Sequence, residues 1–227
     1  MTRTEPTNLA LTARTIAVRT HGRFLVESRT GATATLVGFH GYQENTAIHL
    51  EVLRRIAGGR VVNLVSIQAL HRFYTRGGEV VASWMTKEDR ELAIADNIAY
   101  IDAVLTDVAG SPGITRPLVY VGFSQGVAMA YRAAAFVQPP SDAVIALAGD
   151  VPPDVASVAG TLPRILLGRG SADPWYTPDK AWHDCDLLRK AGVAVVEHVF
   201  DGGHLWDESF VARAGAFLDD RVVATAR

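Results

Sequence analysis

The sequence has a single cysteine, a nearly balanced charge and no long apolar run, and each shortage excludes a class of protein. One cysteine cannot form an internal disulfide, so the fold does not depend on an oxidising compartment. A formal net charge of −2 lacks the clustered basic surface that nucleic-acid binding needs. No run approaches the about 20 apolar residues that span a bilayer, and residues 1–15 contain no secretory apolar core. These shortages predict a soluble cytoplasmic protein with no membrane span and no nucleic-acid partner.

Motifs for metals and nucleotide cofactors are also missing from the sequence. There is no P-loop and no metal-ligand cluster, and Gly168-Arg169-Gly170 lacks the third glycine of a dinucleotide-binding turn. Cys185 lies in a helix-like segment without a base on the same face, which indicates a packed thiol. The sequence therefore predicts no metal and no cofactor.

Length and composition are typical of one globular domain. The chain has 227 residues, of which 48% are apolar and 20% are charged, and this is enough for a sizeable core. Residues 1–14 are polar and aperiodic, so we expect a loosely ordered segment ahead of one domain at residues 15–227. Residues 15–19 and 23–27 flank His21-Gly22, a spacing that predicts a β-hairpin.

Short apolar runs alternate with stretches of helical periodicity through the rest of the chain. Continuous apolar runs fit strands buried on both faces, hence a parallel sheet covered by helices. The expected strands are residues 35–39, 61–65, 118–121, 143–147, 164–167 and 193–200. The expected helices are residues 46–57, 87–108, 124–137, 178–191 and 208–218, with long loops at 70–84 and 150–163. The sequence predicts an α/β fold, a mostly parallel twisted sheet of about seven or eight strands with helices on both faces.

The pentapeptide Gly122-Phe123-Ser124-Gln125-Gly126 stands between an expected strand and an expected helix. This placement exposes a serine hydroxyl at the edge of an α/β sheet, where it can act as a nucleophile. The glycines leave room for the helix to cross the strand closely, and the helix N-terminus directs N–H groups at developing negative charge. The alternative is a helix start in which Ser124 is only the N-cap.

A serine hydroxyl needs an imidazole to accept its proton, and the imidazole needs a carboxylate to fix its tautomer. His204 follows a strand in a glycine-rich loop and precedes the last helix. Asp173 follows the strand at 164–167, and Asp150, at the end of the preceding strand, is its rival. The order Ser124, Asp173, His204 is the one found in serine hydrolases of this architecture. Asp150 runs into Pro152-Pro153 and is expected to anchor that loop instead, which favours Asp173.

An oxyanion hole is expected after the strand at residues 35–39, in His40-Gly41-Tyr42. Gly41 would let the backbone turn, so that the N–H of Tyr42 faces the reacting carbonyl together with the N–H of Gln125. Glu44 and Asn45 are expected to brace this loop and to cap the following helix.

These motifs resemble the carboxylesterase/phospholipase branch of the α/β-hydrolase superfamily, which includes acyl-protein thioesterases and bacterial carboxylesterases. The resemblance is carried by Phe39-His40-Gly41, the Ser124 pentapeptide, Asp173-Pro174, Gly203-His204 and Ser83-Trp84-Met85. It implies a single α/β-hydrolase domain without a large cap, independent of metals, that acts on esters or thioesters and commonly forms a homodimer.

Two segments depart from the pattern of that branch. Tyr42-Gln43-Glu44-Asn45 replaces a Gly or Leu followed by a Gly-Asp pair, and the segment after Asp173 is unusually aromatic. Aromatic side chains near the expected chemistry are predicted to line a substrate pocket. They are Trp84, Phe123, Trp175, Tyr176 and Trp206, with Tyr42 beside them.

The motifs together predict a serine hydrolase that cleaves carboxylic esters of small or medium acyl or aryl substrates through an acyl-enzyme. A thioesterase or a small-molecule acyltransferase is the alternative among enzymes. A ligand-binding protein that keeps the fold without turnover is the alternative of another class, because fold alone does not determine function.

Overall fold

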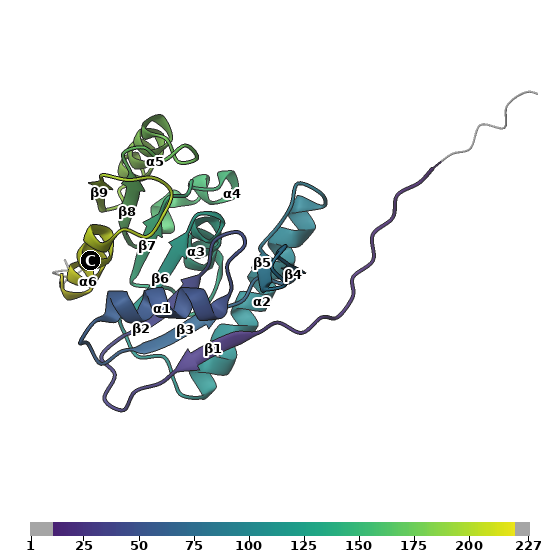
Figure 1. The fold of residues 1–227 in the computed structure, drawn as a ribbon, viewed down its shortest axis with the longest axis horizontal. Helices are drawn as coiled ribbons and strands as arrows, with labels where there is room; N and C mark the ends of the chain where they lie inside the picture. Colours follow the sequence, from purple (N-terminus) through teal and green to yellow (C-terminus); the bar gives the residue numbers. More distant parts are fainter. Residues whose placement is uncertain (1–10, 221–227) are drawn as a thin grey trace, which may run out of the picture.

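The computed structural model describes residues 11–220, in which seven strands form one twisted sheet (Figure 1). Across the sheet the order is β1-β3-β2-β6-β7-β8-β9. In chain order these strands are β1 (Phe24–Glu27), β2 (Thr35–Phe39), β3 (Asn63–Ile67), β6 (Leu118–Phe123), β7 (Ala143–Leu147), β8 (Arg164–Gly170) and β9 (Val195–Phe200). Only β1, at one edge, is antiparallel to its neighbour. The predicted mostly parallel sheet is confirmed.

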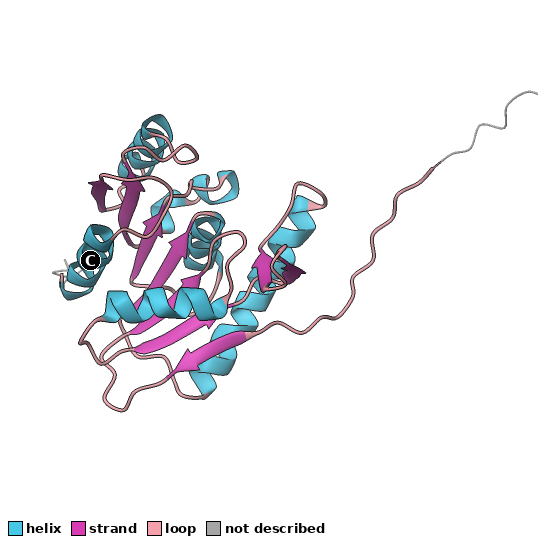
Figure 2. Cartoon of the chain, viewed as in Figure 1, coloured by secondary structure: helices cyan, strands magenta, loops and turns pink. Residues whose placement is uncertain are grey.

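Helices cover both faces of this sheet (Figure 2). They are α1 (Thr46–Ala57), α2 (Arg90–Gly110), α3 (Gln125–Phe136), α4 (Pro153–Ala156), α5 (Pro178–Lys190) and α6 (Glu208–Asp219). α1 contacts α6 on one face, and α2 contacts α3 on the other (Figure 1). Within residues 11–220, none of the helices has both the length and the apolar character required to cross a membrane.

The central strands are buried on both faces, as their unbroken apolar sequences predict. Every residue of β2, β3, β6 and β7 is buried, so side chains of both orientations pack under helices. Cys185 is buried within α5 and is a packed thiol as expected. The core therefore runs through the middle of the sheet and leaves the strand ends free for other residues.

Two expected elements are displaced along the chain. The strand expected at residues 61–65 is Asn63–Ile67, because β3 pairs with β2 in the register Thr35↔Asn63 and leaves Val61 outside the ladder. The helix expected from Lys87 begins only at Arg90, since Asp89 takes a left-handed backbone conformation with φ 47°. Lys87 therefore lies in the connection between β5 and α2.

The expected N-terminal hairpin is wrong. Residues 15–19 form no strand, and β1 pairs instead with β3, in the register Phe24↔Ile67. The apolar residues that suggested a strand, Ile16 and Val18, are 87% and 79% exposed. Side chains this exposed bury little apolar surface, so they provide little free energy for adding a strand at the open edge of β1. Loose order is expected for residues 1–14. Residues 1–10 of this segment lie outside the described residues, and residues 11–14 contain no helix or strand.

The two expected long loops contain regular structure. Within residues 70–84, β4 (His71–Tyr74) and β5 (Val80–Ser83) form an antiparallel hairpin. Residues 150–163 contain α4 and a 3₁₀ turn at Ala159–Thr161. Both were missed because such short elements span too few residues to display a hydrophobic period.

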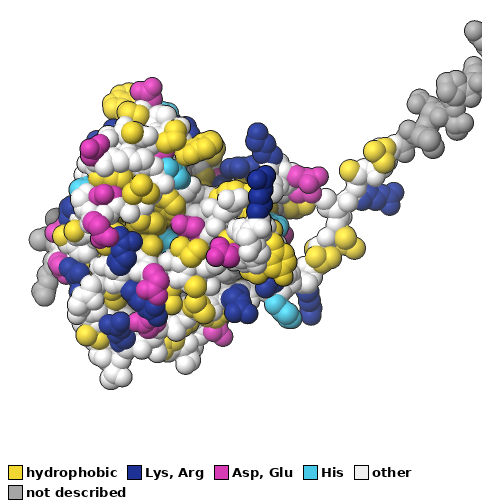
Figure 3. Space-filling view, in the orientation of Figure 1, with side chains coloured by type: hydrophobic (Ala, Val, Ile, Leu, Met, Phe, Trp, Pro, Cys, Tyr) yellow, Lys and Arg dark blue, Asp and Glu magenta, His cyan; other side chains and the backbone are white. Residues whose placement is uncertain are grey.

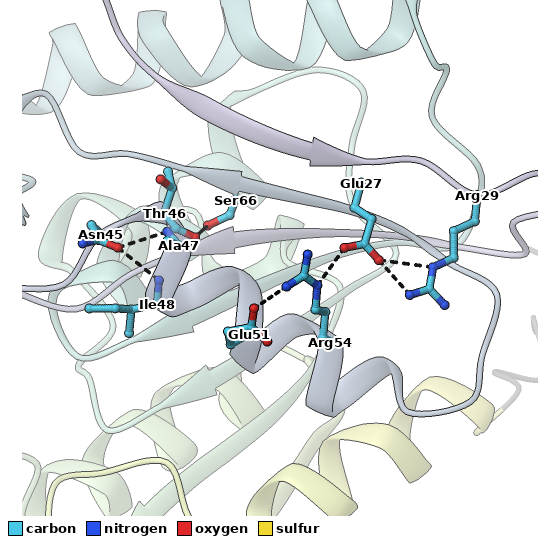
Figure 4. Close-up of polar contacts among 9 residues, drawn as sticks. All are labelled: Glu27, Arg29, Asn45, Thr46, Ala47, Ile48, Glu51, Arg54 and Ser66. Atoms are coloured by element: carbon cyan, nitrogen blue, oxygen red, sulfur yellow. Dashed lines mark hydrogen bonds and ion pairs between the residues drawn. The ribbon is translucent and has the colours of Figure 1, made fainter.

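Polar contacts attach α1 to its surroundings (Figure 4). The side chain of Asn45 caps the helix by accepting the N–H groups of Ala47 and Ile48 at 3.0 Å each, as expected. Arg54 donates to Glu27 of β1 at 2.7 Å. Hydrogen bonds from Arg29 and then from Arg54 lower the pKa of Glu27. The contacts join the edge strand to the helix that packs on it.

A buried cation stabilises the junction of α3 and α4. Arg132 is completely buried and donates to both carboxylate oxygens of Asp154, each at 2.8 Å. Burial alone would raise the pKa of Asp154, but the hydrogen bonds and charge of Arg132 outweigh it, and the net shift is downward. Asp154 therefore neutralises a charge that has no access to water.

Removing the carboxylate should destabilise the fold. We expect Asp154→Asn to lower the free energy of unfolding by about 3 kcal/mol, because it leaves Arg132 buried without a counter-charge. This value is at the low end of the range for breaking a buried ion pair, because Asp154 is one-third exposed. Asp186→Asn, which removes the partner of exposed Lys190, should cost under about 0.5 kcal/mol. Urea unfolding measures both variants, and equal losses would contradict the role given to Asp154.

Candidate active site

Ser124 lies in a sharp turn between β6 and α3. Its backbone has φ 52° and ψ −118°, a conformation that a residue with a side chain rarely adopts. Its N–H donates to the carbonyl of Leu147 on β7 at 2.9 Å. The turn therefore holds the hydroxyl outward at the carboxyl ends of the parallel strands, where substrates bind in sheets of this kind.

The glycines of the pentapeptide are required by space. A Cβ on Gly122 would lie 2.7 Å from the Cα of Val127, and one on Gly126 would lie 2.0 Å from the carbonyl oxygen of Phe39. Both distances are below any tolerable contact, and the atoms that would be hit belong to the backbone. The predicted reason for these glycines, close crossing of the helix and its neighbouring strands, is confirmed.

A hydrogen-bonded chain links three of the predicted site residues. His204 Nε2 is 2.7 Å from Ser124 Oγ, and His204 Nδ1 is 2.8 Å from Asp173 Oδ2. A carboxylate only accepts, so Nδ1 carries the proton and Nε2 is left to accept from the serine hydroxyl. The Asp173 side chain is fully buried, whereas the His204 side chain is 21% exposed. The arrangement can therefore withdraw a proton from Ser124.

The loop after β8 holds Asp173 in place. Its Oδ1 accepts the N–H groups of Trp175 at 2.8 Å and Tyr176 at 3.0 Å. β8 extends beyond its apolar run to Gly170, where a Cβ would lie 2.3 Å from the carbonyl oxygens of Gly202 and Gly203. This close approach of two loops brings the aspartate to the histidine.

Asp150, the rival acid, has another partner. Its Oδ2 lies 3.3 Å from Lys180 Nζ at the start of α5, and both side chains are about half exposed. Of the two carboxylates, the structure places Asp173 against His204.

The loop after β2 presents a free N–H group beside the elbow. The N–H of Gly41 donates to Glu44 Oε2 at 2.7 Å, and that of Gln43 donates to the carbonyl of Ala82. Among residues 11–220, no hydrogen bond is found from the N–H of Tyr42 or from that of Gln125. These are the two groups expected to form the oxyanion hole. Gly41 is needed for space as well, because a Cβ there would lie 2.8 Å from the ring of Phe123.

Buried groups brace this loop. Glu44 binds Gly41 as expected, and burial raises the pKa of the Glu44 carboxyl. His40 is completely buried; its Nδ1 lies 2.7 Å from the carbonyl oxygen of Gly41, and its Nε2 accepts the N–H of Ala69 at 3.0 Å. Burial lowers the pKa of His40 to about 4, so its ring is neutral. The sequence provided the His-Gly motif but no sign that this imidazole is structural.

Trp84 belongs to the same support. It is completely buried, and its indole N–H donates to the carbonyl of His40 at 2.8 Å. Its expected contact with substrate is therefore wrong. The side chain of Gln125 accepts the N–H of Trp84 at 2.8 Å and donates to the carbonyl of Met85 at 2.9 Å. Gln125 thus links the elbow to the end of β5, a role that its place in the pentapeptide did not reveal.

A cleft of about 500 Å³ opens beside Ser124 and His204. It is lined by the connection between β5 and α2 and by the segments that follow β7 and β8. Of the expected pocket aromatics, Trp175 and Tyr176 line it. Tyr176 is almost fully buried and donates to Asp184 at 3.0 Å, whereas Trp175 is mostly exposed.

Phe123 and Trp206 are not among the residues that line this cleft. The Phe123 ring is centred 5.0 Å from that of His204 and 5.6 Å from that of Trp206. Tyr42 stacks on Phe73 of β4 at 5.7 Å. Of the aromatic residues predicted to line a substrate pocket, only Trp175 and Tyr176 therefore line this cleft.

Cationic residues that the sequence did not mark also reach the cleft. Lys87, Arg90 and Lys180 line it together with Ser124 and Asp150. They were missed because a cation in an expected helix is most often a solvated one. In residues 11–220, no group of three or more His, Cys, Asp or Glu side chains is arranged to hold a metal ion.

Acid should destabilise the fold through its buried imidazoles. Burial lowers the pKa of His40 to about 4 and that of His49 to about 3, whereas an unfolded histidine has a pKa of about 6.5. As the pH falls from about 6.5 towards 4, the unfolded chain takes up protons that the folded chain refuses, so the free energy of unfolding falls. In urea unfolding at a series of pH values, the free energy of unfolding should decline less steeply in His40→Gln than in wild type. The slopes should differ by up to about 1.4 kcal/mol per pH unit. Identical slopes in wild type and variant would contradict this.

Solved structures of esterases and thioesterases share this fold. Esterase PE8 superposes with a TM-score of 0.70 at 24% identity, covering 89% of this chain and 99% of the other. Acyl-protein thioesterase 2 of Zea mays gives 0.67 at 21%, covering 88% and 98%, and the carboxylesterase of Bacillus cereus gives 0.67 at 18%, covering 87% and 93%. No protein-family model and no curated protein sequence matches the chain. At these identities the similarity shows the fold, and the α/β-hydrolase fold implied by the sequence resemblance is confirmed.

Proposed function

We propose that the chain is a serine hydrolase that cleaves carboxylic esters of small or medium acyl or aryl substrates. The observation that carries the proposal is the hydrogen-bonded chain from Ser124 through His204 to Asp173, with distances of 2.7 and 2.8 Å. Ser124 and His204 line a cleft of about 500 Å³, a size typical of small-molecule sites.

Acylation begins when Ser124 Oγ attacks the ester carbonyl and its proton passes to His204 Nε2. The carbonyl oxygen gains negative charge, which the N–H groups of Tyr42 and Gln125 stabilise. Each such donor contributes on the order of 3 kcal/mol to the transition state. Asp173 holds the ring in the tautomer that accepts the proton and stabilises the imidazolium that results.

The imidazolium then gives its proton to the leaving alcohol as the carbon–oxygen bond breaks, which leaves Ser124 acylated. In the second half, His204 removes a proton from water, and the hydroxide attacks the acyl carbonyl. Ser124 recovers its proton from His204, and the free carboxylic acid departs. The cycle needs no group beyond the side chains and N–H groups already described.

A thioester is the second candidate substrate. The same atoms would act, with a thiol as the leaving group, and one structural neighbour is an acyl-protein thioesterase. The homodimer and the cytoplasmic location suggested by the sequence stay predictions.

Ser124 should be the residue that a fluorophosphonate labels. We expect labelling of wild type and none of Ser124→Ala. Ser209 provides a matched control, since its Oγ lies 3.1 Å from His198 Nε2 but it belongs to the helix α6 rather than to an elbow. Ser209→Ala should label as wild type does, and labelling that survives Ser124→Ala would overturn the proposal.

Asp173 should matter far more than Asp150. Asp173→Asn is expected to lower kcat for p-nitrophenyl esters by about 10³- to 10⁴-fold, because an amide can hold the wrong tautomer of His204. Asp150→Asn should stay within about tenfold of wild type, because Asp150 binds Lys180 and not the imidazole. A larger loss in Asp150→Asn than in Asp173→Asn would contradict the assignment.

A further inference from the structure

We propose that the substrate carries a carboxylate group remote from the scissile ester, and that Lys87 and Arg90 bind this carboxylate. The inference rests on the proposed hydrolysis at Ser124 and adds the class of substrate. Lys87, Arg90 and Lys180 line the cleft against a single carboxylate, Asp150, although the chain as a whole has a net charge of −2.

The cations of the cleft differ in what they bind. Lys180 is paired with Asp150 at 3.3 Å, which neutralises both. Within residues 11–220, no carboxylate lies within ion-pair distance of Lys87 or Arg90. The charge left over in the cleft is therefore that of Lys87 and Arg90.

Nearby acids do not compensate these two cations. The charge of Arg90 acts on Asp154 through space, but both oxygens of Asp154 are taken by the buried Arg132. Glu88 and Asp89 lie between the two cations in sequence, yet they line a separate hollow with His71 and Asp96 rather than the cleft beside Ser124. The turn before α2 thus sends its basic side chains to the cleft and its acidic ones elsewhere.

The segment that carries Lys87 is anchored to the elbow. The Gln125 side chain binds Trp84 and Met85, and Asn97 donates to the carbonyl of Trp84 at 2.7 Å. Because Lys87 follows two residues later, its backbone has a defined position relative to Ser124. Figure 3 shows Lys and Arg side chains (dark blue) gathered beside hydrophobic surface above β4, β5 and the start of α2.

The apolar part of the lining indicates the rest of the substrate. Met85, Ala128 and Val151 are apolar and line the same cleft as Ser124 and the two cations. An apolar chain or ring that ends in a carboxylate matches this combination of surfaces. The planar guanidinium of Arg90 can bind a carboxylate through two parallel hydrogen bonds, and Lys87 supplies a second positive charge.

Matched pairs of esters test the inference. The first pair is the mono-p-nitrophenyl ester of adipic acid and its methyl ester, which place the charge on the acyl portion. The second pair is 4-acetoxybenzoate and its methyl ester, which place the charge on the alcohol portion. At low ionic strength we expect wild type to prefer the acid in one pair by about tenfold in kcat/KM. The preference should shrink as salt screens the charges.

The double variant Lys87→Gln/Arg90→Gln should lose this preference while it still hydrolyses the neutral methyl esters. Lys190→Gln is the matched control, because it removes one positive charge at the far end of α5, where Lys190 is 75% exposed. This variant should keep the preference of wild type. A preference that persists in the double variant would overturn the assignment of Lys87 and Arg90.

Failure of the inference can be told apart from failure of the proposed function. Hydrolysis of the methyl esters without preference for either acid would overturn the carboxylate site and leave the hydrolase intact. If no ester is hydrolysed, calorimetry with Ser124→Ala and the adipate ester still decides the matter. The site would be supported if the adipate ester with a free carboxylate binds more strongly than its methyl ester and loses this advantage in the Lys87→Gln/Arg90→Gln background. Equal binding of the two esters would overturn it.

Discussion

The backbone turn at Ser124 is the constraint on which the rest of the site depends. A left-handed φ at a serine is unfavourable, so the turn persists only because β6 leads into it, α3 leaves it and Leu147 accepts its N–H. Those neighbours must approach closely, and the only residues that permit the approach at positions 122 and 126 are glycines. The same geometry brings the end of β2 beside the nucleophile, since Phe39 pairs with Gly122. The hydroxyl that lines the cleft, and two N–H groups that have no hydrogen-bond partner among residues 11–220, therefore come from one local arrangement.

Around that turn, buried polar groups hold the reactive ones in position. Asp173 accepts three hydrogen bonds, of which His204 makes only one. Trp84, His40 and Glu44 each bind the backbone of the loop after β2, and the Gln125 side chain binds the end of β5. Such supports limit the motion of groups whose chemistry tolerates little misplacement.

The cleft itself combines two kinds of surface. Its apolar lining gains free energy from any hydrocarbon it covers, but shows little preference among chains of similar size. Discrimination by charge is stronger, because a charged group that leaves water needs a partner. The pairing of Lys180 with Asp150 removes one cation from that role and leaves Lys87 and Arg90. A hydrolase with this lining would select substrates by what they carry away from the reacting bond.

The sequence by itself determined the fold class, the five longer helices over most of their length, and the order in which Ser124, Asp173 and His204 occur along the chain. These follow from hydrophobic periodicity and from motifs whose residues are neighbours in sequence. It could not separate Asp173 from Asp150 by geometry, because both follow strands of the same sheet, and only the approach of Gly170 to residues 202–203 brings one of them to the imidazole. It also could not tell a buried Trp84 from an exposed Trp175, or a cation facing the cleft from one facing solvent. Those distinctions depend on contacts between segments far apart in the chain, which only the tertiary structure decided.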